Sequence, residues 1–151
     1  MSFPFTIRQC LAGDLPAAAA LLAELYRDRP RDAHLDQLPE RLSEFSLVAE
    51  KDGVVVGLLM AEKRMTNSLR DEIGRDAFPD DEHYLEIQDV FVREGDRGQG
   101  IGAVLVRTVL ERAKASGIPR SLVYSANSDY GRIARFYEGC GFRMWHIFMT
   151  Q

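Results

Sequence analysis

A glycine-rich turn joins a strand-like segment to a helix-like segment in the second half of the chain. The turn is formed by Arg97, Gly98, Gln99, Gly100, Ile101 and Gly102. An apolar segment from Tyr84 to Val92 precedes it, and an amphipathic helical pattern from Ile101 to Ser116 follows it. The first N–H groups of a helix lack intrahelical partners and lie at the positive end of its dipole. Because glycines let phosphate oxygens approach the backbone, and Arg97 adds a positive charge, the turn predicts a site for a phosphorylated cofactor.

The residues around the glycines limit which cofactor this can be. A P-loop needs Gly-Lys-Ser/Thr at the end of the turn, and its absence argues against an NTPase. Gly98, Gly100 and Ala103 do fit the looser dinucleotide form G-x-G-x-x-A. That form also needs an early strand and an acidic residue about 20 residues further on. Here the turn lies late and the next acid past Leu122 is Asp129, so a dinucleotide-binding oxidoreductase is the weaker alternative.

A second motif follows the turn, after one strand-like segment from Ser121 to Ala126. It runs from Ala134 to Phe142 and places Phe136-Tyr137 on a helix that ends at a Gly-Phe pair. Together with Arg97, Gly100 and Gly102, which have the spacing Arg-x-x-Gly-x-Gly, it resembles the two signatures of the GNAT N-acetyltransferase superfamily. The strong part of the match covers Tyr84 to Phe142.

The resemblance implies both a fold and an activity. The fold is a single α/β (α+β) domain over 1–151, with a mixed central sheet flanked by helices on both faces. The expected activity is direct transfer of an acetyl group from acetyl-CoA to a primary amine of a small molecule or an amino-terminal acceptor, without an acyl-enzyme. A CoA-binding sensor without turnover is the non-enzymatic alternative.

The resemblance also assigns a general acid. Tyr137 lies where these enzymes carry a tyrosine facing the CoA sulfur. A phenol with a pKa of about 10 stays protonated at neutral pH and can donate to a thiolate. A simple packing role for Tyr137 is the alternative.

Two carboxylates compete for the role of base, because a protonated amine must lose a proton before it attacks. Glu86 matches the position of the glutamate base in histone-type acetyltransferases, and Asp89 matches an acid in diamine acetyltransferases. An odd separation puts the two on opposite faces of a regular strand, although a β-bulge would relax this. A water chain and a purely structural role for either carboxylate stay open.

The remaining cofactor contacts are expected from the backbone and one amide. Val90, Phe91 and Val92 would bind the pantetheine arm like an added strand, and one of their N–H groups would serve the oxyanion. Asn127 would contact the pantetheine amides or cap the last helix. The family often has asparagine and alanine where this chain has Tyr130 and Ile133, which puts cofactor contacts from that helix in doubt.

The hydrophobic periodicity predicts the order β-α-α-β-β-β-α-β-α-β. Strands are expected over Phe5 to Gln9, Leu47 to Lys51, Val54 to Ala61, Tyr84 to Val92, Ser121 to Ala126 and Arg143 to Met149. Helices are expected over Leu15 to Tyr26, around Leu35 to Phe45, from Ile101 to Ser116 and from Tyr130 to Glu138. Asp52-Gly53 suits a two-residue type I′ hairpin turn. Edge pairing of the last strand suggests a possible homodimer.

The segment from Thr66 to Glu82 concentrates negative charge between two strands. It holds six acidic residues, namely Asp71, Glu72, Asp76, Asp80, Asp81 and Glu82, against Arg70 and Arg75. An acidic lid of this kind would attract a cationic amine, and a merely solvated loop is the alternative.

Composition excludes several other classes of protein. The net charge of −4 argues against a nucleic-acid partner, and no apolar run approaches the roughly 18 residues of a membrane span. The N-terminus has no secretory signal pattern, and Cys10 and Cys140 are too few for a disulfide scaffold, so a cytoplasmic protein with reduced thiols is expected. His34, His83 and His146 lack the spacing of metal ligands, so no metal is expected.

Overall fold

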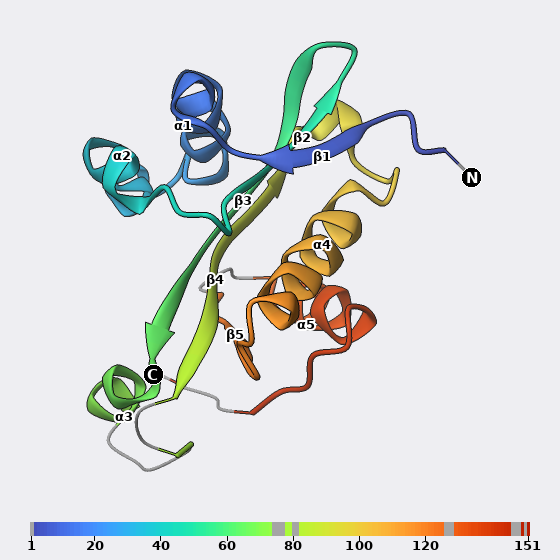
Figure 1. Ribbon diagram of the computed structural model, residues 1–151. Helices are drawn as coiled ribbons and strands as arrows, with labels where there is room; N and C mark the ends of the chain where they lie inside the picture. Colours follow the sequence, from blue (N-terminus) through green and yellow to red (C-terminus); the bar gives the residue numbers. More distant parts are fainter. Residues whose placement is uncertain (1, 74–77, 80–81, 126–128, 146–148, 150) are drawn as a thin grey trace.

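One mixed β-sheet organises the computed structural model (Figure 1). The structure describes all residues except 1, 74–77, 80–81, 126–128, 146–148 and 150. Within them the strands follow one another in the sheet as β1 (Thr6–Gln9), β2 (Leu47–Lys51), β3 (Val54–Met65), β4 (His83–Val92) and β5 (Ser121–Val123). All neighbours are antiparallel except β4 and β5, which are parallel. The mixed sheet predicted from the sequence is confirmed.

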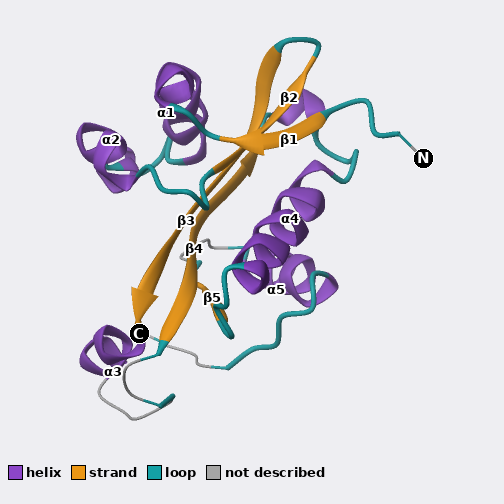
Figure 2. Ribbon diagram, in the orientation of Figure 1, coloured by secondary structure: helices purple, strands orange, loops and turns teal. Residues whose placement is uncertain are grey.

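Helices cover both faces of this sheet (Figure 2). On one face lie α1 (Leu15–Leu25) and α2 (Leu38–Arg41), and on the other lie α4 (Ile101–Ala115) and α5 (Tyr130–Gly139). Side chains alternate across a strand, so Leu58 and Met60 of β3 join the core under α1, and Leu59 and Ala61 join the core under α4. Among the described residues, no helix is long and apolar enough to span a bilayer.

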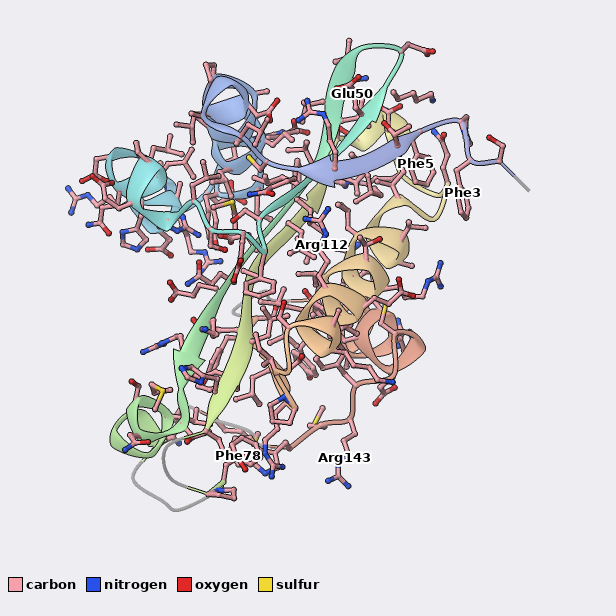
Figure 3. The ribbon with its side chains drawn as sticks, viewed as in Figure 1. Phe3, Phe5, Glu50, Phe78, Arg112 and Arg143 are labelled. Carbon is pink, nitrogen blue, oxygen red and sulfur yellow. The ribbon has the colours of Figure 1, made fainter. Side chains whose placement is uncertain are left out.

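The hairpin between β2 and β3 has the predicted turn. Asp52 and Gly53 both adopt positive φ, 52° and 76°, as a type I′ turn requires. β3 then continues to Met65, beyond the predicted end at Ala61. Near the N-terminus, Phe3 and Phe5 stack beside β1 with ring centroids 5.1 Å apart (Figure 3).

A helix that the sequence analysis did not predict follows β3. α3 spans Thr66–Ile73, within the segment expected to be an acidic lid. Thr66 is buried, and its Oγ1 donates to the Pro79 carbonyl at 2.7 Å, so the start of α3 is tied to the returning chain. The helix was missed because Leu69 and Ile73 are the only apolar residues in its sequence, too few to produce a clear helical periodicity.

The connection between α1 and β2 also differs from the prediction. In place of one short helix over Leu35 to Phe45, the chain forms 3-10 turns at Pro30–Ala33 and Leu35–Gln37, followed by the single-turn helix α2. His34, between the two turns, adopts a left-handed conformation with φ of 47°, which breaks the helical run.

A β-bulge interrupts the pairing of β3 with β4. Met60 pairs with Asp89, but its neighbour Ala61 pairs with Ile87, so Gln88 is an extra residue on β4. Glu86 pairs with Glu62 and Asp89 with Met60. Because Met60 and Glu62 are two residues apart, Glu86 and Asp89 lie on the same face of the sheet, the face that α1 and α2 cover.

The parallel strands β4 and β5 separate after a short pairing. Leu85, Glu86 and Ile87 pair with Ser121, Leu122 and Val123, and no further pairing follows within the part of the chain that the structure describes. β5 is therefore shorter than the predicted Ser121 to Ala126, whose last residue lies outside the described residues. Of the predicted last strand, residues 146–148 lie outside the described residues, and Arg143 to Trp145 form no strand.

Candidate active site

The glycine-rich turn leaves a set of backbone donors exposed at the start of α4. Gly98 and Gly100 adopt positive φ, 77° and 80°, which side chains disfavour, and Gly100 is the N-cap of the helix. Within the described part of the chain, no side chain caps this helix and no acceptor takes the N–H groups of Gly98, Gln99 and Gly100. These donors, together with the first N–H groups of α4, can cradle a phosphate.

Arg97 lies at the edge of this turn. Its Nε donates to the Val92 carbonyl at 2.9 Å, and its guanidinium carbon lies 5.1 Å from the centroid of the Phe91 ring. No described carboxylate forms an ion pair with Arg97, so its terminal nitrogens can meet an anion at the turn.

A buried carboxylate that the sequence analysis missed supports the turn from behind. Asp96, 5% exposed, accepts from Lys51 Nζ at 3.2 Å and forms an ion pair with Arg93 at 2.7 Å. The Arg93 hydrogen bond, opposed by burial and reinforced by Lys51, lowers the pKa of Asp96. Lys51 also donates to the Gln99 side chain at 3.3 Å, so β2 is connected to the turn. Only the spatial pairing of Lys51 with Asp96 shows this role, because 45 residues separate them.

Backbone groups of β4 face the gap that β5 leaves open. The Arg93 N–H donates to the Val56 carbonyl on β3, so by the antiparallel alternation Phe91 also faces β3, while Val90 and Val92 face away from it. Val90 therefore presents its N–H and C=O groups at the open edge, and Val92 presents its N–H there, while the Val92 carbonyl accepts from Arg97. The backbone groups of Phe91, predicted to bind with them, point to β3 instead, and its side chain packs in the core under α1.

Two clefts meet on this side of the molecule. The larger, called here the α2-side cleft, has a volume of about 640 Å³ and is lined by Tyr26, Asp32, His34, Gln37, Glu40, Arg41, Glu62, Gln88 and Asp89. The smaller, the β5-side cleft, has about 220 Å³, and its lining includes Val90, Tyr124, Ile133 and Tyr137. Tyr26, Asp32, Gln88 and Asp89 line both. A substrate in one cleft can therefore reach a group held in the other.

Asp89 is the buried carboxylate at this junction. It is 5% exposed, accepts from the Tyr26 hydroxyl on Oδ1, and forms an ion pair with Arg41 through Oδ2. Burial, with the hydrogen bond to Asp89 as the next cause, raises the pKa of Tyr26 above its ordinary value. Each carboxylate oxygen can accept more than one hydrogen bond, so Asp89 can still receive a proton from a ligand.

Glu86 lies on the same face of β4 but lines neither cleft. It is 7% exposed and forms an ion pair with Arg64 at 2.7 Å. The Tyr84 hydroxyl donates to it at 3.2 Å, and Gln88 Nε2 donates at 3.4 Å. These partners surround Glu86 within the sheet face.

Tyr137 reaches the β5-side cleft from α5, on the other side of the sheet from α1. Its ring packs edge-on against Phe136 and Phe142, with centroids 4.9 and 5.6 Å away. Burial, with smaller contributions from Cys140 and Asp89, raises the pKa of Tyr137 above its ordinary value. Ile133 lines the same cleft, whereas Tyr130 is largely exposed. Asn127 lies outside the described residues.

The sequence profile of the acetyltransferase (GNAT) family matches residues 15–142. The chain belongs to the acetyltransferase (GNAT) family. It is therefore an N-acetyltransferase of the class that uses acetyl-CoA. Among curated proteins no sequence matches it.

Solved structures share the fold of this acetyltransferase over nearly its whole length. The aminoglycoside N-acetyltransferase AAC(6')-Iy, in complex with CoA, is 21% identical with a TM-score of 0.76, covering 97% of this chain and 93% of that one. A transcriptional regulator from Bacillus halodurans C-125 is 25% identical, with a TM-score of 0.75 and coverage of 97% and 98%. AAC(6')-Iy in complex with the bisubstrate analogue CoA-S-monomethyl-acetylneamine is 22% identical, with a TM-score of 0.73 and 97% of each chain covered.

The acetyltransferase brings some predicted residues together and separates others. Asp89, Val90 and Tyr137 all line the β5-side cleft. Glu86 lies apart from it, and the glycine-rich turn lies at the start of α4, beyond the end of β4. Tyr26, at the end of α1, and Arg41, in the single-turn helix α2, were not predicted, because both lie far from the motifs in sequence and act through contacts with β4.

Proposed function

We propose that this enzyme transfers the acetyl group of acetyl-CoA directly to a primary amine of a small cationic molecule. The observation that carries the proposal is the meeting of two clefts at Asp89, with Tyr137 and the open edge of β4 on one side. Acetyl-CoA would enter from the β5-side cleft and the amine from the α2-side cleft. The chain would act as one catalytic domain.

The turn and the open strand edge would bind acetyl-CoA. The N–H groups from Gly98 to Gly102 would hold the diphosphate, with Arg97 beside them. Gly102 lets the start of α4 pack against Phe136 of α5, because an added Cβ would lie 3.3 Å from that ring. The pantetheine arm would pair with Val90 and Val92 like an added strand. Asn127 stays a predicted contact for its amides.

The chemistry would need one proton acceptor and one proton donor. An amine with a pKa of about 10.4 is almost fully protonated at neutral pH, so it must lose a proton before attack. Asp89 is the better placed base, because it lines both clefts and Glu86 lines neither. The neutral amine forms a C–N bond with the thioester carbonyl, and the Val90 N–H stabilises the oxyanion.

Collapse of this intermediate breaks the C–S bond. The Tyr137 hydroxyl gives its proton to the departing CoA thiolate, and the nitrogen loses its surplus proton to the resulting phenolate, which restores the phenol. Asp89 then releases to solvent the proton that it took from the ammonium group. The raised pKa of Tyr137 suits this role, since the phenol stays protonated over the working pH range.

The charge of the α2-side cleft supports a cationic acceptor. Four carboxylates line it, from Asp32, Glu40, Glu62 and Asp89, against the single guanidinium of Arg41. Such a cleft raises the local concentration of ammonium groups. The acidic lid predicted over Thr66 to Glu82 stays a hypothesis, since parts of it lie outside the described residues. Within it, Glu82 forms an ion pair with Arg120 at 3.1 Å.

The test combines binding with turnover. Calorimetry should detect CoA binding. CoA release should then be followed with spermidine, with neamine and with a peptide that has an amino-terminal alanine, and a reaction without any acceptor serves as the blank. We expect turnover with spermidine or neamine. Tyr137→Phe should lower kcat by about 100-fold while the Kd for CoA changes by less than about twofold. CoA binding without turnover on any acceptor would favour the sensor, and absence of CoA binding would overturn the proposal.

A further inference from the structure

Arg41 contributes the one guanidinium to the lining of the α2-side cleft. Its side chain is 18% exposed and comes from the last residue of the single-turn helix α2. It makes two contacts with different segments. Nη2 pairs with Asp89 Oδ2 on β4, and Nη1 donates to the Ala33 carbonyl at 3.1 Å. A planar guanidinium can hold both acceptors in one fixed geometry.

The contact with Ala33 fixes the segment that forms one wall of the cleft. Ala33 ends the 3-10 turn Pro30–Ala33 and is buried, and its neighbours Asp32 and His34 both line the cleft. His34 adopts φ of 47°, a conformation that persists in a non-glycine residue only when its surroundings hold it. The hydrogen bond from Arg41 to the residue before it is one such restraint.

The contact with Asp89 fixes the proposed base. The Tyr26 hydroxyl and Arg41 occupy opposite oxygens of this carboxylate, so its rotation is restrained from both sides. Tyr26 belongs to the end of α1 and Arg41 to α2, so both helices that cover this face meet at one carboxylate.

We infer that Arg41 is a positioning residue. It fixes the cleft wall formed by Asp32 and His34, where the amine would bind, relative to the Asp89 carboxylate that would take the amine's proton. The inference rests on the proposed function in taking Asp89 as the base and the α2-side cleft as the acceptor site. Arg41 itself stays bound to Asp89 and Ala33 and takes no proton. Its role is to place the amine nitrogen, held by the wall, within reach of the carboxylate.

Two substitutions at this position separate the two contacts. Lysine keeps a positive charge for Asp89, but a single ammonium cannot reproduce the fixed fork that also reaches Ala33. Methionine keeps most of the apolar stem and loses both contacts. Arg31→Lys is the matched control, because Arg31 belongs to the same turn and is exposed, and its side chain forms no hydrogen bond or ion pair with the described residues.

The experiment measures kcat and KM with whichever of spermidine or neamine turns over faster. We expect Arg41→Lys to raise KM about fivefold, the loss of one hydrogen bond, with kcat changed by less than about threefold. Arg41→Met should also lower kcat by at least about tenfold, since the base loses its restraint. Arg31→Lys should match the wild type. An Arg41→Lys enzyme with wild-type KM, or one as impaired in kcat as Arg41→Met, would overturn the inference.

A second measurement separates this inference from the proposed function. Hydrogen exchange of the backbone amides in residues 30–37 should be faster in both Arg41 variants than in the wild type and in Arg31→Lys. CoA affinity, measured on the same samples, should be unchanged and shows that the variants are folded. If the wild type acetylates none of the acceptors, the proposed function fails, and the exchange data still decide whether Arg41 orders the wall. Unchanged exchange in both Arg41 variants would reject that ordering.

Discussion

The two carboxylates on β4 show how a single extra residue changes the chemistry available to a strand. In a regular strand Glu86 and Asp89, three positions apart, would point to opposite faces; because the bulge leaves Gln88 unpaired, both point toward α1 and α2. What then distinguishes them is their surroundings. Asp89 lies where the two clefts meet, and Glu86 is enclosed by Arg64, Tyr84 and Gln88.

Substitution of each carboxylate by its amide should therefore have unequal effects. Asp89→Asn removes the proposed proton acceptor and should lower kcat by about 100-fold or more. Glu86→Gln should lower kcat by less than about tenfold, because Glu86 lines neither cleft and contacts only other side chains of the sheet. Steady-state kinetics at saturating acetyl-CoA, with circular dichroism to verify folding, gives the comparison. The reverse order of effects would assign the base to Glu86.

Residues with a role in the motifs could be predicted from the sequence, because local spacing defines them. The glycines of the turn need positive φ, and Tyr137 follows from its place on a helix before Gly-Phe. Arg41 and Asp96 could not be predicted in this way. Their partners, Asp89 and Lys51, lie 48 and 45 residues away, so only the folded arrangement of helices and strands brings them together.

At the scale of elements, the position of α4 decides where the glycine-rich turn lies. Gly57 on β3 makes this possible, since an added Cβ would lie 3.2 Å from both Ala49 and Ile101 and 3.4 Å from Leu105. Ile101 is the first residue of α4, directly after the turn. The helix start and the sheet therefore touch at a position that has no side chain.

Gly57→Val should displace the start of α4. Overpacking at this contact should lower the free energy of unfolding by about 1–3 kcal/mol, and the displaced turn should bind CoA more weakly. Denaturant titration and calorimetry measure the two effects. Val54→Ile, at an exposed position on the same strand, is the control and should change neither. A folded Gly57→Val protein with wild-type CoA affinity would contradict this coupling.

The elements that the sequence predicted well are those with a strong local signal. The Asp52-Gly53 turn, α1 and α4 fall within about a residue or two of their predicted bounds, as caps and apolar stripes allow. α3 was missed for lack of an apolar stripe, and β5 was predicted too long, because Tyr124 and Ser125 continue the strand pattern after the pairing with β4 has ended. Strand ends depend on the partner strand, which no local pattern contains.

At the scale of the whole molecule, one ion-pair network joins the first strand to the rest of the fold. Arg8 on β1 binds Asp14 at 2.8 Å and Glu50 on β2 at 2.9 Å, and Glu50 lies near the hairpin end of the sheet (Figure 3). Asp14 also accepts from the Leu11 N–H at 2.8 Å. The Arg8 hydrogen bond lowers the pKa of Asp14 from its ordinary value of 3.8, against the opposing effect of burial.

This lowered pKa predicts how stability depends on pH. The folded state binds the Asp14 proton more weakly than the unfolded state, so the contribution is complete above pH 3.8 and is lost as the pH falls below it. Asp14→Asn should cost about 1 kcal/mol of unfolding free energy at pH 7, and this difference should shrink toward pH 3. Urea titrations of both proteins at pH 7, 5 and 3 measure it. A difference that stays constant with pH would show that Asp14 acts without its charge.

The chain as a whole carries a net charge of −4, yet under the proposed function the charges that would act on the acceptor are those of the α2-side cleft. If these attract a polyamine, kcat/KM for spermidine should fall several-fold between about 0.05 and 0.5 M salt, as screening shortens the reach of the cleft's field. Glu40→Gln should reduce this salt dependence, because Glu40 lines the cleft. Glu44→Gln makes the same change in net charge at an exposed position outside the lining and should leave the dependence intact. Equal effects of the two variants would mean that the field of the whole molecule, rather than that of the cleft, draws the acceptor in.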